Sequence, residues 1–199
     1  MKPIENCIVN KDTSKNPIWL MRQAGRYLPE FRELRANNQD FIKLCLNESL
    51  SSEITLQPIK RFGFDAAIIF SDILMIPFAI NQEVKFEKGF GPKLGNLNLD
   101  KIKEITNEEF TNRLKPVYNA ITRTSQSSLL NDKDLIGFVG APWTILVYMI
   151  NKMSPKNGLP GTFFLPDGLI QSNSSNISRV LVPNATPLIS SISDLVTGW

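Results

Sequence analysis

The chain has 199 residues, of which 42% are hydrophobic and 21% are charged, and its formal net charge is +3. This length and composition predict a globular protein with one substantial core, and the small net charge argues against binding to nucleic acid or to an anionic membrane surface. The sequence contains no histidine, which excludes a Ser-His-Asp or Cys-His catalytic arrangement within it, and its two cysteines lack the spacing of a metal site.

No export signal or membrane span is expected in this sequence. The segment Met1–Lys11 carries charges and lacks the apolar centre of a signal peptide. The longest uncharged run, Leu135–Asn151, is too short to cross a membrane and contains glycine and proline. We therefore expect a soluble, cytoplasmic protein whose cysteines are reduced.

The first predicted element is a short buried strand over Ile18–Met21, which ends at a charged residue. That residue, Arg22, and the later Arg26 lie on either side of a small-residue pair. The planar guanidinium group of arginine binds a carboxylate or phosphate through two hydrogen bonds, so two arginines at a strand end are typical of an anion clamp. The alternative is a solvent-exposed strand end at which the arginines pair with Glu30 and Glu33.

Helical segments are expected next. Pro29 suits the first turn of a helix, because its missing N–H group would have no partner there. Asp40 is the expected N-cap of a helix over 41–46, and a longer helix follows. Pro58 predicts a kink or a break in that longer helix. Its apolar face is expected to include Leu50, Ile54 and Phe62.

A near-continuous apolar run, Phe64–Phe70, predicts a strand that is buried on both faces, as in parallel sheets. The run is followed by Asp72, which places a carboxylate at the carboxyl end of a strand. The alternative role for Asp72 is the N-cap of a helix that begins at Ile73. The alternating pattern of 84–86 then predicts a short exposed strand, with a turn at Gly89, Gly91 and Pro92.

The remaining elements continue an alternation of helices and strands. Apolar spacings of three and four residues predict a helix over Asn107–Leu130, and Leu135–Gly140 predicts another buried strand. A turn over Ala141–Thr144 leads into Ile145–Ile150, which is either a helix or a second apolar segment. This order predicts an α/β protein with parallel strands, whose chemistry lies at the carboxyl ends of those strands.

Three parts of the sequence carry a resemblance to a known family. The stretch Trp19–Glu30 reads Trp-Leu-Met-Arg-Gln-Ala-Gly-Arg-Tyr-Leu-Pro-Glu. The second part comprises Leu56–Phe62 and Asp65–Leu74, and the third is Gly137–Met149. In their order and spacing these parts resemble the uroporphyrinogen decarboxylase family, over about 3–156.

The resemblance implies an α/β fold that is the N-terminal portion of a (β/α)8 TIM barrel, truncated in this chain. It also implies decarboxylation of the four acetate side chains of uroporphyrinogen III to give coproporphyrinogen III in haem biosynthesis, without a metal or an organic cofactor. The substrate is a polycarboxylate tetrapyrrole, and its protonated pyrrole ring accepts the electrons of the departing carboxylate in place of a cofactor. The intact family tends to form homodimers.

The resemblance also implies roles for individual residues. Asp72 is expected to be catalytic, because a carboxylate that faces the pyrrole N–H groups would stabilise the positive charge that develops in the transition state. The expected substrate-binding residues are Arg22, Gln23, Ala24, Gly25, Arg26, Asp72, Phe138 and Tyr148. The alternatives are a core position for Phe138 and a core aromatic with a hydrogen-bonded hydroxyl for Tyr148. Trp19 and Trp143 are expected to be packing residues.

Residues 158–199 do not match the family, so we expect a partial barrel over 1–157 and a separate tail over 158–199. The tail is rich in serine, asparagine and proline, and its only charged residues are Asp167, Arg179 and Asp194. We expect this tail to lack regular structure, as the product of a shifted reading frame would. The serine and histidine that the later half of the family barrel supplies to the site are expected to be missing.

Two alternatives to an active decarboxylase stay open. One is an inactive truncated or frameshifted fragment, because a complete barrel of this kind needs about 250 residues. The other is a corrinoid-linked methyltransferase, a relative with a similar barrel, which would require zinc ligands such as histidine late in the chain. The sequence contains no histidine, so this alternative ranks last.

Overall fold

The computed structural model describes residues 1–87, 89–154, 162–165 and 168–171. The chain divides into two compact units. The first unit comprises Met1–Met75 and Asn112–Phe138, and the second comprises Ile76–Thr111 and Val139–Trp199.

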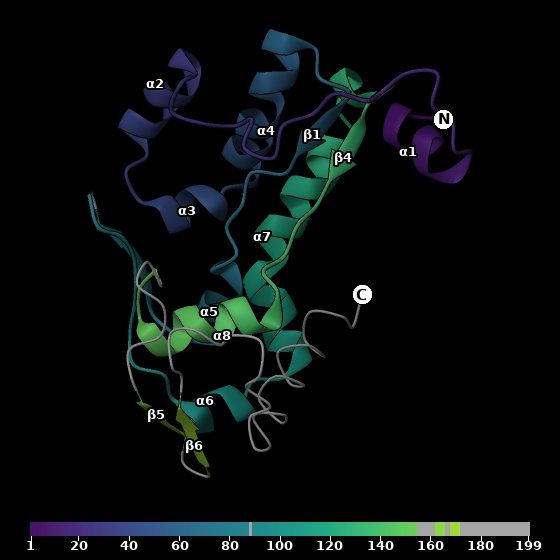
Figure 1. Cartoon of the computed structure of the whole chain (residues 1–199). Helices are drawn as coiled ribbons and strands as arrows, with labels where there is room; N and C mark the ends of the chain where they lie inside the picture. Colours follow the sequence, from purple (N-terminus) through teal and green to yellow (C-terminus); the bar gives the residue numbers. More distant parts are fainter. Residues whose placement is uncertain (88, 155–161, 166–167, 172–199) are drawn as a thin grey trace. The chain divides into compact units, whose positions relative to one another are not determined.

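The first unit contains a pair of parallel strands with helices around it. The strands β1 (Ala66–Ile68) and β4 (Asp134–Ile136) lie side by side in Figure 1, with Ala66 opposite Asp134 and Ile68 opposite Ile136. The unit also contains α1 (Pro3–Val9), α2 (Pro29–Asn37), α3 (Phe41–Cys45), α4 (Glu48–Phe62), the 3-10 helix η1 (Ser128–Leu130) and most of α7 (Asn107–Ser125). The parallel pairing confirms the predicted α/β class.

The helix boundaries follow the predicted caps. Pro29 is the first residue of α2, and the Asp40 side chain accepts a hydrogen bond from the Lys43 N–H at the start of α3. α4 begins after Asn47, whose side chain accepts from the Leu50 N–H at 3.0 Å. Pro58 does not break α4, which continues to Phe62, so that part of the prediction is wrong.

The predicted strand over Ile18–Met21 does not form, and the side chains of this segment are exposed. Its backbone is bonded to Asp65, the residue before β1, whose N–H donates to the Ile18 carbonyl at 2.9 Å and whose carboxylate accepts from the Ile18 N–H at 2.7 Å. The Leu20 N–H is bonded instead to the side-chain oxygen of Gln23, at 3.1 Å. A strand needs a continuing ladder of backbone hydrogen bonds, and this side-chain bond interrupts it.

The core of the first unit lies where helices pack on each other and on β1. One cluster joins α2, α3 and α4 and contains Leu28, Phe31, Leu34, Leu44 and Ile54. A second cluster packs against β1 and contains Ile59, Ala67 and Leu130. Both β1 and β4 are shorter than predicted, although the Ile69 N–H adds one more bond to the Ile136 carbonyl, at 3.0 Å.

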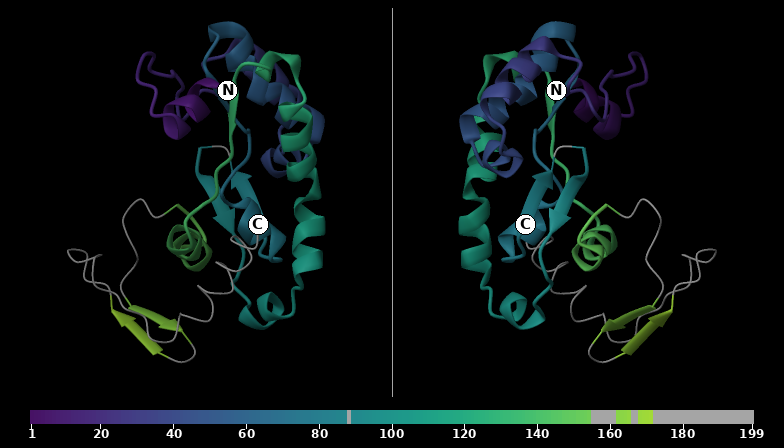
Figure 2. Two further views of the ribbon diagram at one scale, coloured as in Figure 1. Left: turned by 90° about the vertical axis from the view of Figure 1, so that its right-hand side faces the viewer. Right: turned by 90° about the vertical axis from the view of Figure 1, so that its left-hand side faces the viewer.

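The second unit contains the predicted hairpin. The strands β2 (Val84–Glu87) and β3 (Gly91–Leu94) are antiparallel, drawn as paired arrows in Figure 2. Gln82 joins the hairpin to α8 (Pro142–Asn151), because its amide donates to the Gly95 carbonyl at 2.9 Å and to the Met149 carbonyl at 3.0 Å. The helix α8 decides between the two alternatives for 145–150 in favour of a helix. The unit also contains α5 (Met75–Ala79), of which Met75 belongs to the first unit, and α6 (Leu99–Lys103).

The described residues of the tail form a hairpin, which contradicts the expectation that they lack regular structure. It is formed by β5 (Thr162–Leu165) and β6 (Gly168–Gln171), which pair antiparallel. The sequences Thr-Phe-Phe-Leu and Gly-Leu-Ile-Gln are separated by Pro166 and Asp167, two turn-favouring residues. The rest of the expectation for 158–199 concerns residues outside the described ranges.

Candidate functional site

The arginines of the 22–26 loop are exposed and make no hydrogen bond or ion pair within the described part of the chain. The alternative in which they pair with Glu30 and Glu33 is wrong. Glu30 is instead bound by Arg61, whose Nε and Nη2 atoms donate to the two carboxylate oxygens at 2.9 and 2.8 Å. Among the described residues, the guanidinium groups of Arg22 and Arg26 therefore have no partner that would compete with a bound anion.

Gln23 attaches this loop to the sheet. Its side chain is 1% exposed, and its Nε2 atom donates to the Ala66 carbonyl at 2.8 Å. Its Oε1 atom accepts from the Leu20 N–H, and its backbone carbonyl accepts from the Tyr27 hydroxyl. Both ends of the Gln23 amide are therefore bonded to the protein backbone, which ties the loop to the first residue of β1.

The two small residues of the loop pack closely against their neighbours. Ala24 packs against the cluster formed by α2, α3 and α4. A Cβ atom added at Gly25 would lie 3.3 Å from the Tyr27 ring, which is tighter than an ordinary contact. Small side chains at both positions therefore let the loop pack closely against its neighbours, while its arginines are exposed to solvent.

Asp72 lies just after β1 and is partly buried. Its Oδ1 atom accepts from the Leu74 N–H at 2.8 Å, and its carbonyl accepts from the Met75 N–H at 3.1 Å. Burial raises the pKa of the Asp72 carboxyl above its usual 3.8, while the bond from Leu74 acts in the opposite direction. Asp72 is not the N-cap of α5, because that helix begins only at Met75. The Oδ2 atom of Asp72 has no hydrogen-bond partner among the described residues.

A cysteine lies within electrostatic reach of Asp72. Cys45 in α3 is buried, and both this burial and the negative charge of Asp72 raise the pKa of its thiol. The thiol is therefore neutral at physiological pH, and Cys45 contributes no charge to the surroundings of Asp72.

Two buried hydroxyl groups next to this site were not singled out from the sequence. Ser51 and Thr55 on α4 both form hydrogen bonds to the backbone of Phe70, which is two residues before Asp72. The available signal was two small hydroxyl residues four apart on the buried side of a helix. That pattern alone does not identify their partner, because Phe70 lies 15 and 19 residues away along the chain.

The aromatic candidates lie in different units. Phe138, in the first unit, is 46% exposed, which argues against the core alternative. Tyr148, in α8 of the second unit, is partly buried, and its hydroxyl lies 3.5 Å from the Ser154 hydroxyl. Trp19 is exposed, so its expected packing role is wrong, whereas Trp143 is partly buried.

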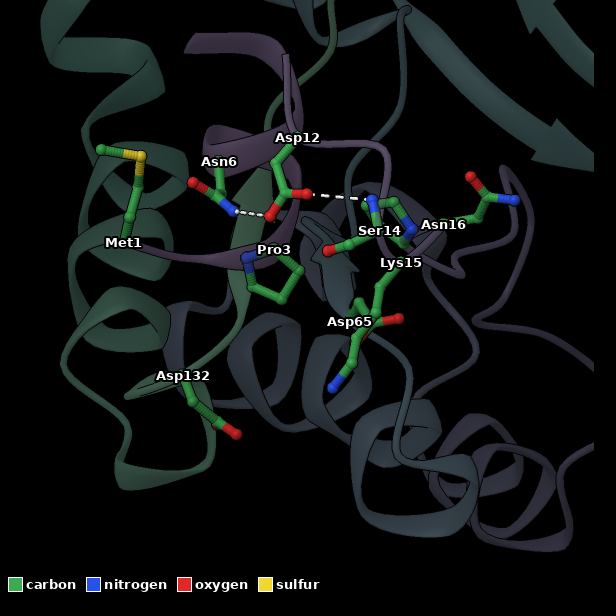
Figure 3. A pocket seen from close by; sticks show the side chains of 10 residues that line it. Met1, Pro3, Asn6, Asp12, Ser14, Lys15, Asn16, Asp65 and Asp132 are labelled. Atoms are coloured by element: carbon green, nitrogen blue, oxygen red, sulfur yellow. Dashed lines mark hydrogen bonds between the residues drawn. The ribbon is translucent and has the colours of Figure 1, made fainter. Parts of the chain in front are cut away.

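A pocket of about 560 Å³ lies at the opposite end of the strands, next to the residues that precede β1 and β4. Figure 3 shows its polar lining, in which the Asp12 carboxylate accepts from Asn6 at 2.6 Å and from the Ser14 N–H at 2.9 Å. Asp65 and Asp132 also line it. Because parallel α/β proteins place their chemistry at the carboxyl ends of strands, this pocket is not the candidate site.

No group of three acidic, cysteine or histidine side chains in the described ranges could hold a metal ion. Among the described helices, none is long and apolar enough to cross a membrane.

Comparisons with a family profile and with individual known proteins identify the same family. The profile described as "Uroporphyrinogen decarboxylase (URO-D)" matches residues 1–158. The chain is 49% identical over 148 residues to a uroporphyrinogen decarboxylase of Chelativorans sp., covering 74% of this chain and 43% of the relative. Proteins of the same name from Brucella anthropi and Brucella ovis are 47% identical over the same lengths. The chain thus spans less than half of these relatives.

Proposed function

Because this chain belongs to the uroporphyrinogen decarboxylase family, we propose that its protein removes the four acetate carboxyl groups of uroporphyrinogen III and releases coproporphyrinogen III. The observation that carries the proposal is the family match over residues 1–158, which includes the free arginine pair and Asp72. Within this proposal, 1–157 supply the first part of a (β/α)8 barrel, and 158–199 are a separate tail. The protein would act in the cytoplasm as a homodimer.

The arginine pair suits the charge of the substrate. Uroporphyrinogen carries eight carboxylates, so a site for it needs several guanidinium groups that are not already paired. Arg22 and Arg26 meet this condition, and the bonds made by Gln23 hold the loop that presents them. Their role is to bind and orient the carboxylates rather than to donate protons, because a guanidinium group is a poor acid at neutral pH.

Asp72 suits the charge that develops during the reaction. Protonation of a pyrrole ring carbon creates a cation, which then takes up the electrons of the breaking C–C bond as CO₂ leaves. A partly buried carboxylate is less well screened by water, so it stabilises this cation more strongly than an exposed one would. The Oδ2 atom is available to accept from the pyrrole N–H groups.

A chimera tests this function for the residues that the chain contains. Residues 1–156 would replace the corresponding part of the Chelativorans relative, and conversion of uroporphyrinogen to coproporphyrinogen would be followed by chromatography under reducing conditions, with and without a chelator. We expect stepwise conversion in both cases. The 199-residue chain, assayed in parallel, shows whether it acts alone.

The matched control is Asp72→Asn in the same chimera, which keeps an oxygen for the Leu74 N–H. We expect kcat to fall about 100-fold with little change in KM, because the lost charge acts mainly on the transition state. Near-normal turnover in this variant would remove the catalytic role of Asp72. An inactive chimera, with the relative active beside it, would contradict the proposed function.

A further inference from the structure

Two hydroxyl groups of α4 bind both backbone polar groups of one residue. The Ser51 hydroxyl donates to the Phe70 carbonyl at 2.6 Å, and the Phe70 N–H donates to the Thr55 hydroxyl at 2.8 Å. The Thr55 hydroxyl in turn donates to the Ser51 carbonyl at 2.7 Å. Both side chains are buried, and the bonds to Phe70 are partly buried.

Phe70 is the first residue after the hydrogen bonds between the two parallel strands end. The last bond between the two parallel strands is donated by the Ile69 N–H to Ile136. One residue later, the backbone of Phe70 is bonded to the Ser51 and Thr55 hydroxyls of α4 instead of to a strand. The Phe70 ring packs edge-on against Phe31 and Phe41, with centroid distances of 6.0 and 5.7 Å. The chain is therefore fixed at Phe70 by its backbone and by its side chain.

Asp72 depends on this fixed point. Within the described ranges, its hydrogen bonds are those from Leu74 and Met75, which follow it in the chain, so they shape the local turn without attaching it to another element. We propose that Ser51 and Thr55 are positioning residues that hold the Asp72 carboxyl in place for the decarboxylation, an inference that rests on the proposed function. They act through the backbone of Phe70 and do not contact the substrate.

Only a hydroxyl can make both bonds of Thr55. Its donation to the carbonyl four residues earlier fixes the rotamer, which leaves a lone pair directed at the Phe70 N–H. Valine has nearly the same shape but can neither donate nor accept, so it would remove the partner of that partly buried N–H. Serine would keep both bonds.

The chain offers a matched control for Thr55→Val. Thr124 in α7 is also buried, and its hydroxyl donates to the Ala120 carbonyl four residues earlier, at 2.6 Å. Thr124→Val therefore removes the same group and the same type of intrahelical bond, but no bond to the segment that follows β1. Any effect on Asp72 that exceeds the control is due to the Phe70 bond.

The first measurement is independent of catalysis. The ¹³C signal of the Asp72 carboxyl would be followed against pH in the full chain. We expect Thr55→Val to move the midpoint down, toward the ordinary value, because a released carboxyl becomes better solvated, and Thr124→Val to leave it unchanged. The titratable or charged groups on other elements near Asp72 are the Cys45 thiol, whose pKa the Asp72 charge raises, and the Arg35 guanidinium, which lowers the pKa of that thiol.

The second measurement is steady-state decarboxylation by the chimera that carries the same substitutions. Thr55→Val is expected to lower kcat at least about tenfold relative to Thr124→Val, with KM little changed, and Thr55→Ser to restore it. If the unsubstituted chimera shows no turnover, the proposed function fails, and the carboxyl titration alone decides the positioning role.

Equal titration midpoints in Thr55→Val and Thr124→Val would overturn the inference. Should Thr55→Val fail to fold, Ser51→Ala provides the decision, because it removes only the bond to the Phe70 carbonyl. A midpoint lowered in Ser51→Ala would support the inference, and an unchanged one would contradict it.

Discussion

The arginines of the first unit differ in what they bind, and this difference predicts their kinetic roles. Arg61 forms an ion pair with Glu30, whereas Arg22 and Arg26 have no ion-pair partner among the residues that the structure describes. Lysine replaces the two-point guanidinium contact with a single charge, so we expect Arg22→Lys and Arg26→Lys each to raise KM about tenfold and to leave kcat nearly unchanged. Steady-state kinetics of the chimera measure this.

Arg61→Lys is the matched control for these two variants, because it changes an arginine that is already paired, and its KM is expected to stay the same. A loss of kcat at constant KM in Arg22→Lys or Arg26→Lys would instead indicate a part in the chemical step.

The raised pKa of Asp72 also predicts how stability depends on pH. A carboxyl with a folded-state pKa above its unfolded value stabilises the fold fully below the unfolded pKa, and this contribution is lost as pH rises through the folded pKa. At neutral pH the charged form therefore opposes folding. We expect Asp72→Asn to raise the free energy of unfolding at pH 7 by about 0.5 kcal/mol, and the gain to disappear at acidic pH.

Denaturant unfolding of both proteins at several pH values measures this difference. A variant that is less stable than the original chain at pH 7 would show that the Asp72 charge is compensated within the fold.

At the scale of single elements, local chemistry was enough to predict most helices. Pro29 and Asp40 mark the starts of α2 and α3 because their effects involve only the next three residues. The prediction of a strand over Ile18–Met21 failed for the opposite reason. Apolar content is a local signal, but the backbone hydrogen bonds of a strand depend on partners far away in the sequence. The Gln23 side chain, which bonds to Leu20 and to Ala66, could not be anticipated from spacing.

The start of α4 provides a test at this scale, because this helix carries Ser51 and Thr55. Asn47→Ala removes the side-chain oxygen that accepts from the Leu50 N–H. We expect the free energy of unfolding to fall by about 1 kcal/mol, the usual effect of losing an N-cap, while Asn47→Ser stays close to the original value. Equal losses in both variants would mean that the hydrogen bond to Leu50 does not stabilise the helix.

For the molecule as a whole, the candidate site could be predicted only in part. Arg22, Arg26 and Asp72 were identified because charged residues at the ends of apolar runs are visible in the sequence. The hydroxyls of Ser51 and Thr55 were not, because their bonds to Phe70 exist only once α4 has packed against β1. The relation of Tyr148 to these residues stays a prediction, since it lies in the second unit.

The exposed segment Ile18–Met21 predicts a difference between this chain and a longer protein. Leu20 and Met21 are 51% and 74% exposed, and the chain spans 43% of the length of its Chelativorans relative. If the proposed barrel is correct, the part of the relative that this chain does not span supplies strands that cover the segment. Leu20→Gln and Met21→Gln should then change the stability of the 199-residue chain by no more than about 0.5 kcal/mol. In the chimera the same changes should lower the free energy of unfolding by about 1.5 kcal/mol or more each, because the side chains are buried there.

Val9→Gln, a change in an apolar residue of α1 that is 64% exposed, is the control and should be neutral in both proteins. Denaturant unfolding of the paired variants measures these differences, and equal, small effects in both proteins would contradict burial of this segment by the rest of a barrel.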